Sequence, residues 1–212
     1  MANLNAPSGL SPSISRGANP YNGQFRVYYI PSTDTNAYAI GDPVKSLTGA
    51  ASANGISAVT LATAGTSNSI RGVVCTAGAA FGGNTVWQAA GQGFFDPNAL
   101  GTVIIPASKS QSYFVGVVDD PDLMFEIQEW GGASYTAFTA ADVGKNCNLK
   151  AGTNNGYISG WVLDTTAASA TTVGLQVKLM QLVQRKDNVF GQYARWLVML
   201  NQHELNMPTV GV

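Results

Sequence analysis

The chain has 212 residues, of which 45% are hydrophobic and only 11% are charged, and its formal net charge is -1. Soluble domains carry roughly 25% charged residues, so this exterior is expected to be poor in charge. Without clustered Lys and Arg, a nucleic-acid partner is not expected, and without a run of about 18 apolar residues neither is a membrane partner. The length suits one all-β domain, or two small β subdomains that share a core.

A charge-poor exterior can be covered by protein at little desolvation cost, which favours an assembly protein and a homo-oligomer, either a dimer or a trimer. A secreted or cell-surface β domain is the alternative that shares this composition. The first residues lack a basic region followed by an apolar run, so no secretory signal is predicted. Cys75 and Cys147 are expected to be buried free thiols, with a disulfide between them as the alternative.

Residues 1–24 are predicted to form an extended N-terminal arm, followed by a β-rich domain over residues 25–212. The arm is rich in Pro, Ser, Gly and Asn, which predicts neither helix nor regular strand. If extended, it would reach roughly 70 to 80 Å, enough to cross onto a neighbouring subunit. Residues 5–24 are therefore the expected docking arm, and residues 195–212 a second contact or an oligomer seam.

Short runs of β-branched and aromatic residues follow, separated by turn residues at a spacing near ten. This pattern predicts a mainly β fold, an antiparallel sandwich or barrel-like domain with very little helix. The expected strands are residues 25–30, 37–40, 44–46, 58–62, 69–76, 102–106, 112–118, 123–128, 135–139, 147–150, 157–163, 172–184 and 195–201.

Within residues 172–184, alternate positions from Val173 to Val183 are nearly all apolar, as a half-buried strand requires. One helical turn is expected, with Thr139 as its N-cap and Gly144 as its stop. Residues 188–191 are interpreted as a turn. The Ala, Gly, Ser and Thr stretches at residues 48–68 and 77–84 are interpreted as long loops or weak strands.

The sequence offers little for catalysis. His203 is the only histidine, so a Ser-His-Asp or Cys-His hydrolase lacks a credible base, and His203 is expected to be a hydrogen-bonded surface or interface residue. One histidine and two separated cysteines form no zinc ligand set. Paired carboxylates for a glycosidase are not singled out by their setting. Neither an enzyme, a cofactor nor a small-molecule substrate is expected.

Residues 119–122, with Glu126 and Glu129, form the one concentration of acidic side chains. A calcium site is one interpretation. A turn between two strands, with Glu126 and Glu129 in solvent, is favoured because Pro121 interrupts the run and no EF-hand spacing is present. The same acids are also consistent with a face that meets a basic partner.

Several aromatic residues are candidates for a sugar-binding platform, although core packing or an interface is the favoured interpretation. They are Trp87, Phe94, Phe95, Trp130 and Tyr135.

Eight stretches, in one order over most of the chain, resemble the structural cement or head decoration proteins of tailed bacteriophages. They are residues 19–24, 29–34, 40–44, 70–74, 118–129, 142–146, 182–188 and 194–203. The resemblance implies a protein on the capsid exterior of a virion assembled in the bacterial host cytoplasm. It also implies that the chain clamps neighbouring subunits of the major capsid protein, and it transfers no catalytic residues.

Two alternatives stay open. One is a tail or head-to-tail structural component, and the other is a glycan-binding β protein of the virion that uses Trp87 or Trp130. The hypothetical partner-binding residues are Arg16, Asn19, Pro20, Tyr21, Asn22, Arg195, Trp196 and His203.

Overall fold

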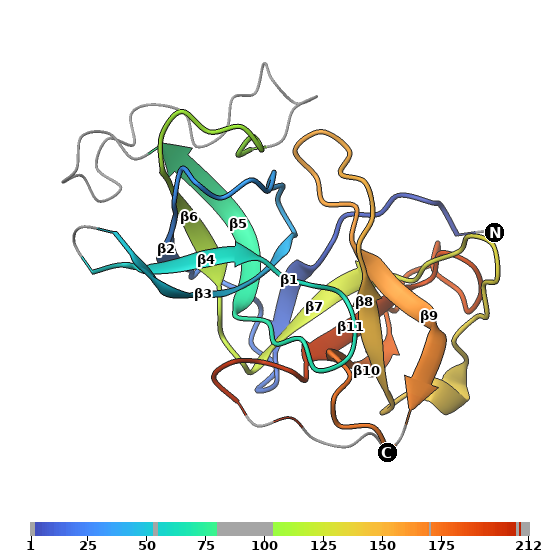
Figure 1. The fold of residues 1–212 in the computed structure, drawn as a ribbon. Helices are drawn as coiled ribbons and strands as arrows, with labels where there is room; N and C mark the ends of the chain where they lie inside the picture. The colour runs from blue at the N-terminus through green and yellow to red at the C-terminus, as the bar shows by residue number, and fades with distance from the viewer. Residues whose placement is uncertain (1–2, 53–54, 80–103, 170, 207, 209–212) are drawn as a thin grey trace.

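A computed structural model of the chain describes residues 3–52, 55–79, 104–169, 171–206 and 208 (Figure 1). Over these residues the chain is almost entirely β, with one short 3-10 turn, so the predicted fold class is confirmed. The elements are β1 (Ser11–Ser15), β2 (Arg26–Ile30), β3 (Pro43–Ala51), β4 (Ser57–Leu61), β5 (Gly72–Ala79), β6 (Tyr113–Val118), β7 (Leu123–Gln128), η1 (Ala140–Asp142), β8 (Asn146–Lys150), β9 (Val162–Ser169), β10 (Val177–Leu182) and β11 (Arg195–Leu200).

The strands form a closed barrel and an open sheet that lie side by side in Figure 1. The barrel has the order β2-β4-β3-β5-β6, and the six-stranded sheet has the order β1-β7-β11-β10-β8-β9. The pairs between these strands are antiparallel apart from β2 and β4, which run parallel where Tyr29 faces Ala58. A parallel pair was not predicted, because strand spacing along the chain does not specify which strands meet.

The turn between β6 and β7 carries the chain from the barrel into the sheet. Its neighbours Val118 and Leu123 are both buried, and they belong to a core cluster that also takes Ile70 and Val73 from the barrel side. Phe125 of β7 joins the same cluster from the sheet side. The barrel and the sheet therefore share this core cluster, while a second cluster that includes Ile30, Val59 and Val115 fills the barrel itself.

The N-terminal arm departs from the prediction. Residues 11–15 form β1, which pairs with β7 at the edge of the sheet, with a register shift between Pro12 and Ile14. Leu10 has no exposed surface, and its N–H donates to the carbonyl of Gly41 at 3.0 Å. The arm is therefore part of this chain's own fold. The expectation of a wholly non-regular arm was wrong, because β7 offers an edge within the same chain with which residues 11–15 pair.

Two glycines allow the arm to lie close to the barrel. Gly9 and Gly41 adopt φ values of +62° and +94°, and a Cβ built on Gly9 would lie 2.5 Å from both the Gly41 carbonyl oxygen and the Ser159 side chain. Only glycine meets both requirements at position 9. The arm is thus held by backbone contact as well as by strand pairing.

Several predicted strands differ from the structure. Residues 135–139 form no strand, residues 37–40 contribute only isolated bridges at Tyr38 and Ile40, and residues 172–176 precede β10. β3 continues through Ala51 into a stretch expected to be loop or weak strand. Residues 80–103, which include Trp87, Phe94 and Phe95, lie outside the described residues.

Other local predictions are confirmed. Thr139 caps η1 in a capping box with Asp142, and Gly144 follows with φ +87°. The strand after residues 188–191 is β11. Cys75 and Cys147 are both free thiols, although Cys147 is buried and Cys75 only half-buried. Within the described residues, no helix has the length and apolar character needed to cross a bilayer.

Two leucines of the arm provide a matched test of its packing. Leu10→Ala removes a fully buried side chain and is expected to lower the free energy of unfolding by about 2 to 5 kcal/mol. Leu4→Ala removes a side chain that is 79% exposed and should change stability by less than about 0.5 kcal/mol. Urea denaturation of both variants measures the difference, and equal stabilities would contradict an arm packed on its own domain.

Candidate functional site

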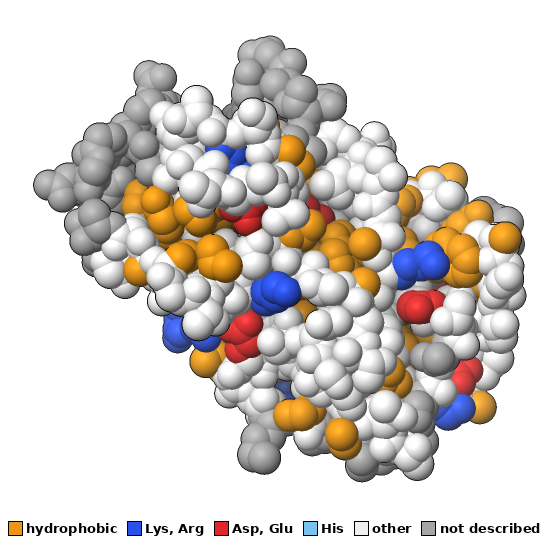
Figure 2. Space-filling view, viewed as in Figure 1, with side chains coloured by type: hydrophobic (Ala, Val, Ile, Leu, Met, Phe, Trp, Pro, Cys, Tyr) orange, Lys and Arg blue, Asp and Glu red, His pale blue; other side chains and the backbone are white. Residues whose placement is uncertain are grey.

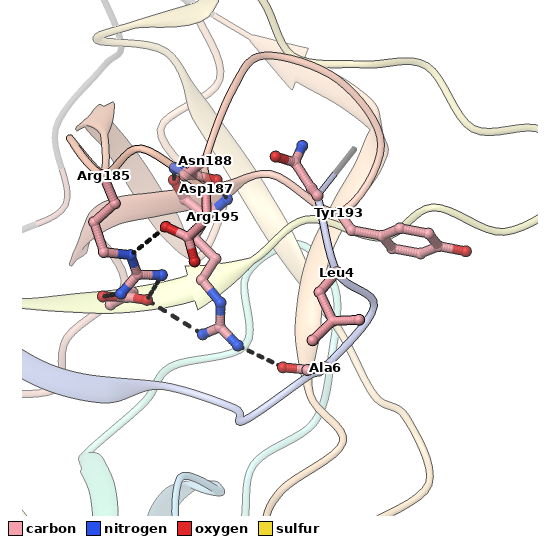
Figure 3. A pocket seen from close by; sticks show the side chains of 9 residues that line it. Leu4, Ala6, Arg185, Asp187, Asn188, Tyr193 and Arg195 are labelled. Carbon is pink, nitrogen blue, oxygen red and sulfur yellow. Dashed lines mark hydrogen bonds and ion pairs between the residues drawn. The ribbon is translucent and has the colours of Figure 1, made fainter. Parts of the chain in front are cut away.

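A cleft of about 480 Å³ lies between the arm and the segment that joins β10 to β11 (Figure 3). The arm lines it with Asn3, Leu4 and Ala6, and the joining segment lines it with residues from Arg185 to Arg195. We call it the arm cleft. It lies at the end of the sheet where β7 and β11 are neighbours.

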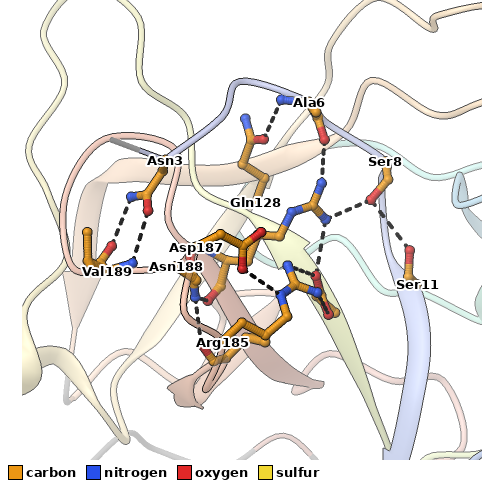
Figure 4. A network of polar contacts seen from close by, with 12 residues as sticks. Asn3, Ala6, Ser8, Ser11, Gln128, Arg185, Asp187, Asn188 and Val189 are labelled. Carbon is orange, nitrogen blue, oxygen red and sulfur yellow. Dashed lines mark hydrogen bonds and ion pairs between the residues drawn. The ribbon is translucent and has the colours of Figure 1, made fainter. Parts of the chain in front are cut away.

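A network of ion pairs crosses the arm cleft (Figure 4). Glu126 of β7 accepts from Arg195 at 3.2 Å and from Arg185 at 3.0 Å. Arg195 also donates to the hydroxyl of Ser8 at 3.1 Å and to the carbonyl oxygen of Ala6. Because one guanidinium bonds both a carboxylate on β7 and two residues of the arm, Arg195 fastens the arm to the sheet.

Asn3 makes a second attachment of the arm. Its side-chain amide donates to the carbonyl oxygens of Val189 and Gln192, both at 2.9 Å, and its oxygen accepts from the Val189 N–H at 2.9 Å. Asn188 in turn bonds the backbone of Val183 and Arg195. The polar side chains of this cleft are therefore bonded within the chain, either to one another or to backbone groups.

Three exposed apolar side chains belong to the two segments that border the cleft, and one of them, Leu4, also lines it. Leu4 is 79% exposed, Val189 46% and Phe190 49%, and the bonds of Asn3 hold Leu4 beside the segment that carries the other two. The Phe190 ring packs on Trp196, with 5.8 Å between centroids. We call Leu4, Val189 and Phe190 the apolar ridge. Sequence reasoning missed it, although two apolar residues in a predicted turn were a signal.

Four of the predicted partner-binding residues lie together. Asn19, Pro20, Tyr21 and Asn22 line a hollow of about 240 Å³ beside the β6–β7 turn. Arg16 lies close by in sequence and pairs with Asp122 at 3.2 Å. Both partners of that ion pair are more than half exposed, so it contributes little to stability.

The prediction of partner binding was wrong for two other residues. Trp196 has no exposed surface and His203 is only 3% exposed, so both belong to the interior and neither is available to a partner. The Nδ1 of His203 accepts from the N–H of Leu205 at 3.0 Å. Burial holds the pKa of His203 below its ordinary value. The side chain of Arg195 is 19% exposed, but its hydrogen bonds hold the arm to the sheet.

The acidic segment is a turn, as favoured, and some of its acids are paired with arginines. Asp119 is buried and accepts from the Tyr28 hydroxyl at 2.6 Å, with Arg71 at 3.6 Å. Glu126 is held by Arg185 and Arg195, so its expected place in solvent was wrong. Asp120 remains exposed at the turn. Among the described residues, no group of three potential ligands could hold a metal ion.

Glu129 was also expected in solvent, and this prediction was wrong. It has no exposed surface, and its carboxyl accepts from the Tyr135 hydroxyl at 2.7 Å and the Trp196 indole N–H at 3.0 Å. Burial raises the pKa of Glu129 to about 7, and the two hydrogen bonds offset only part of that shift. A buried proton-binding group thus lies at the end of β7, beside the Trp196 side chain.

The chain was compared with protein-family models, with curated proteins and with solved structures, and none of the three comparisons found a match.

Glu129 predicts a pH dependence of stability. Its folded pKa lies above the ordinary value of 4.5, so its contribution is complete below pH 4.5 and is lost as the pH rises through about 7. The loss is at most roughly 3 kcal/mol. Glu129→Gln should remove this part of the dependence. Urea denaturation from pH 4 to pH 8 measures it, and parallel curves for the two proteins would contradict the assignment.

The bonds of Arg195 lead to a prediction about how tightly the arm is held. Arg195→Met removes the bonds to Ala6 and Ser8 and should speed hydrogen exchange of the Ala6 amide by roughly tenfold or more. Arg185→Met removes a bond to the same Glu126 without touching the arm, so it is the matched control. Exchange measured by NMR distinguishes the two. If both variants behave alike, Arg195 does not fasten the arm.

Proposed function

We propose that the chain is a structural protein of a phage virion that binds the outer surface of the capsid and cements neighbouring major capsid subunits. The observation that carries the proposal is the apolar ridge, which stands exposed beside a cleft whose charges are paired within the chain. A protein partner can cover such a surface favourably. Burial of its apolar side chains lowers the free energy, and its charged side chains are already paired within the chain.

The rest of the exterior supports the same role. Figure 2 shows a face on which charged side chains are few and separated by neutral ones. Many of the described charges are also paired in the chain. These pairs include Arg16 with Asp122, Arg26 and Arg71 with Asp119, Lys109 with Asp34, Lys145 with Asp142, and Arg185 and Arg195 with Glu126.

The energy that the ridge offers is modest for each copy. Full burial of a Leu, Val or Phe side chain contributes roughly 1.5 to 3 kcal/mol, and association costs remove part of the sum. Cementing gains strength from repetition, because each copy that contacts two subunits adds its contribution at another seam of the shell. The proposed action is binding alone, with no chemical step and no cofactor.

Binding to capsids that lack this protein tests the proposal. Leu4→Glu combined with Val189→Glu places two charges on the ridge and is expected to weaken capsid binding by roughly tenfold or more. Val143→Glu combined with Leu205→Glu is the matched control, because these side chains are 41% and 49% exposed but do not belong to the ridge. Co-sedimentation measures both affinities.

Two outcomes would count against the proposal. Unchanged affinity of the ridge variant would exclude the ridge as the contact. Absence of any binding to capsids, together with ring formation by the purified chain, would favour a tail or head-to-tail component instead.

A further inference from the structure

A second pocket also involves the arm and differs in chemistry from the arm cleft. It has a volume of about 240 Å³, and Trp130, Lys150, Thr153, Tyr193 and Asn5 contribute to its lining. We call it the tryptophan pocket. The arm takes part in both hollows, with Asn3 and Leu4 in the arm cleft and Asn5 in this pocket.

Several hydrogen-bond donors of the tryptophan pocket have no acceptor among the described residues. The Lys150 ammonium lies 4.1 Å from the centroid of the Trp130 ring, and no described carboxylate pairs with it. The Trp130 indole N–H and the hydroxyls of Thr153 and Tyr193 make no hydrogen bond within the described residues. The Asn5 oxygen accepts from Gln128 at 3.0 Å, which leaves its NH₂ without a described partner. Hydrogen-bond donors therefore gather here without acceptors.

Two aromatic rings lie against glycine backbone at this pocket. A Cβ on Gly131 would lie 2.4 Å from the Tyr193 ring, and a Cβ on Gly132 would lie 2.6 Å from the Trp130 ring. Both rings thus rest on backbone that only glycine leaves clear. Tyr193 also adopts φ +65°, a left-handed conformation that is strained for tyrosine. Figure 3 shows its ring pointing away from the ion pairs of the arm cleft.

We propose that the tryptophan pocket binds an acidic saccharide, one sugar ring of which carries a carboxylate. Lys150 supplies the charge for the carboxylate, the hydroxyl, indole and amide groups donate to the sugar oxygens, and the aromatic rings contact its C–H groups. The pocket is smaller than the roughly 300 to 1,000 Å³ of sites for drug-sized ligands, so one ring is the largest group expected to enter.

An acidic protein side chain explains the pocket less well. A single Asp or Glu carboxylate would engage Lys150 but would leave the Thr153, Tyr193 and Asn5 donors without acceptors. A sugar ring carries oxygens around its whole circumference, which matches donors that come from the arm, β8, the segment after it and the segment before β11. This site is separate from the apolar ridge and does not depend on the proposed capsid role.

Calorimetric titration of the full chain tests the proposal, with trigalacturonate and sialyllactose as acidic saccharides and fully methyl-esterified trigalacturonate as the uncharged match. Lys150→Met keeps the side-chain stem and removes the charge, and Lys186→Met makes the same charge change at an exposed lysine outside the pocket. Saturable binding of an acidic saccharide is expected, weakened roughly tenfold or more by Lys150→Met and unchanged by Lys186→Met. The ester should bind more weakly than the acid.

A second measurement distinguishes loss of saccharide binding from loss of folding. The Trp130 indole N–H signal in NMR should shift during titration of the wild type and not of Lys150→Met, while the two proteins melt at similar temperatures. The proposal is overturned if neither acidic saccharide binds, or if both lysine variants weaken binding equally. It is also overturned if an acetylated tripeptide with a central Glu binds as tightly as the saccharides, since that would assign the pocket to a protein carboxylate.

Discussion

The ion pair between Glu126 and Arg195 is the interaction on which both surfaces depend. It joins β7 to β11 at a diagonal position, since Glu126 faces Leu197 and Arg195 faces Gln128 across the ladder. The same guanidinium reaches Ala6 and Ser8, so the pair also determines where the arm lies. Partial burial makes such a bond stronger than an exposed ion pair, because water screens it less.

From this anchor the arm contributes to two surfaces. Asn3 and Leu4 line the arm cleft, and Leu4 belongs to the apolar ridge. Asn5 lines the tryptophan pocket and bonds Gln128. A ligand in the pocket and a protein on the ridge would therefore both contact the same few residues of the arm. The two proposed binding events are close enough to influence each other through it.

Local sequence patterns were informative wherever a residue's own neighbours decide its structure. Aromatic and β-branched runs identified most of the strands, and Thr139 as N-cap with Gly144 as stop identified the helical turn of the described residues. Patterns failed where a distant contact decided the outcome. In β10 the register shifts between Leu179 and Gln181, so Leu182 packs against the core although strict alternation had placed Gln181 on the buried face.

The candidate site likewise has features that local sequence predicted and features that depend on distant contacts. Sequence alone predicted a mainly β chain with a charge-poor exterior, because composition and period-two patterning are local properties. It grouped Asn19 with Asn22 as neighbours but placed Trp196, His203 and Glu129 at the surface. Only the tertiary structure decided that these three are buried, that the arm pairs with β7, and that Lys150 lies over Trp130. The physical reason is that burial and pairing depend on segments that lie from tens of residues to more than a hundred apart, which no local pattern records.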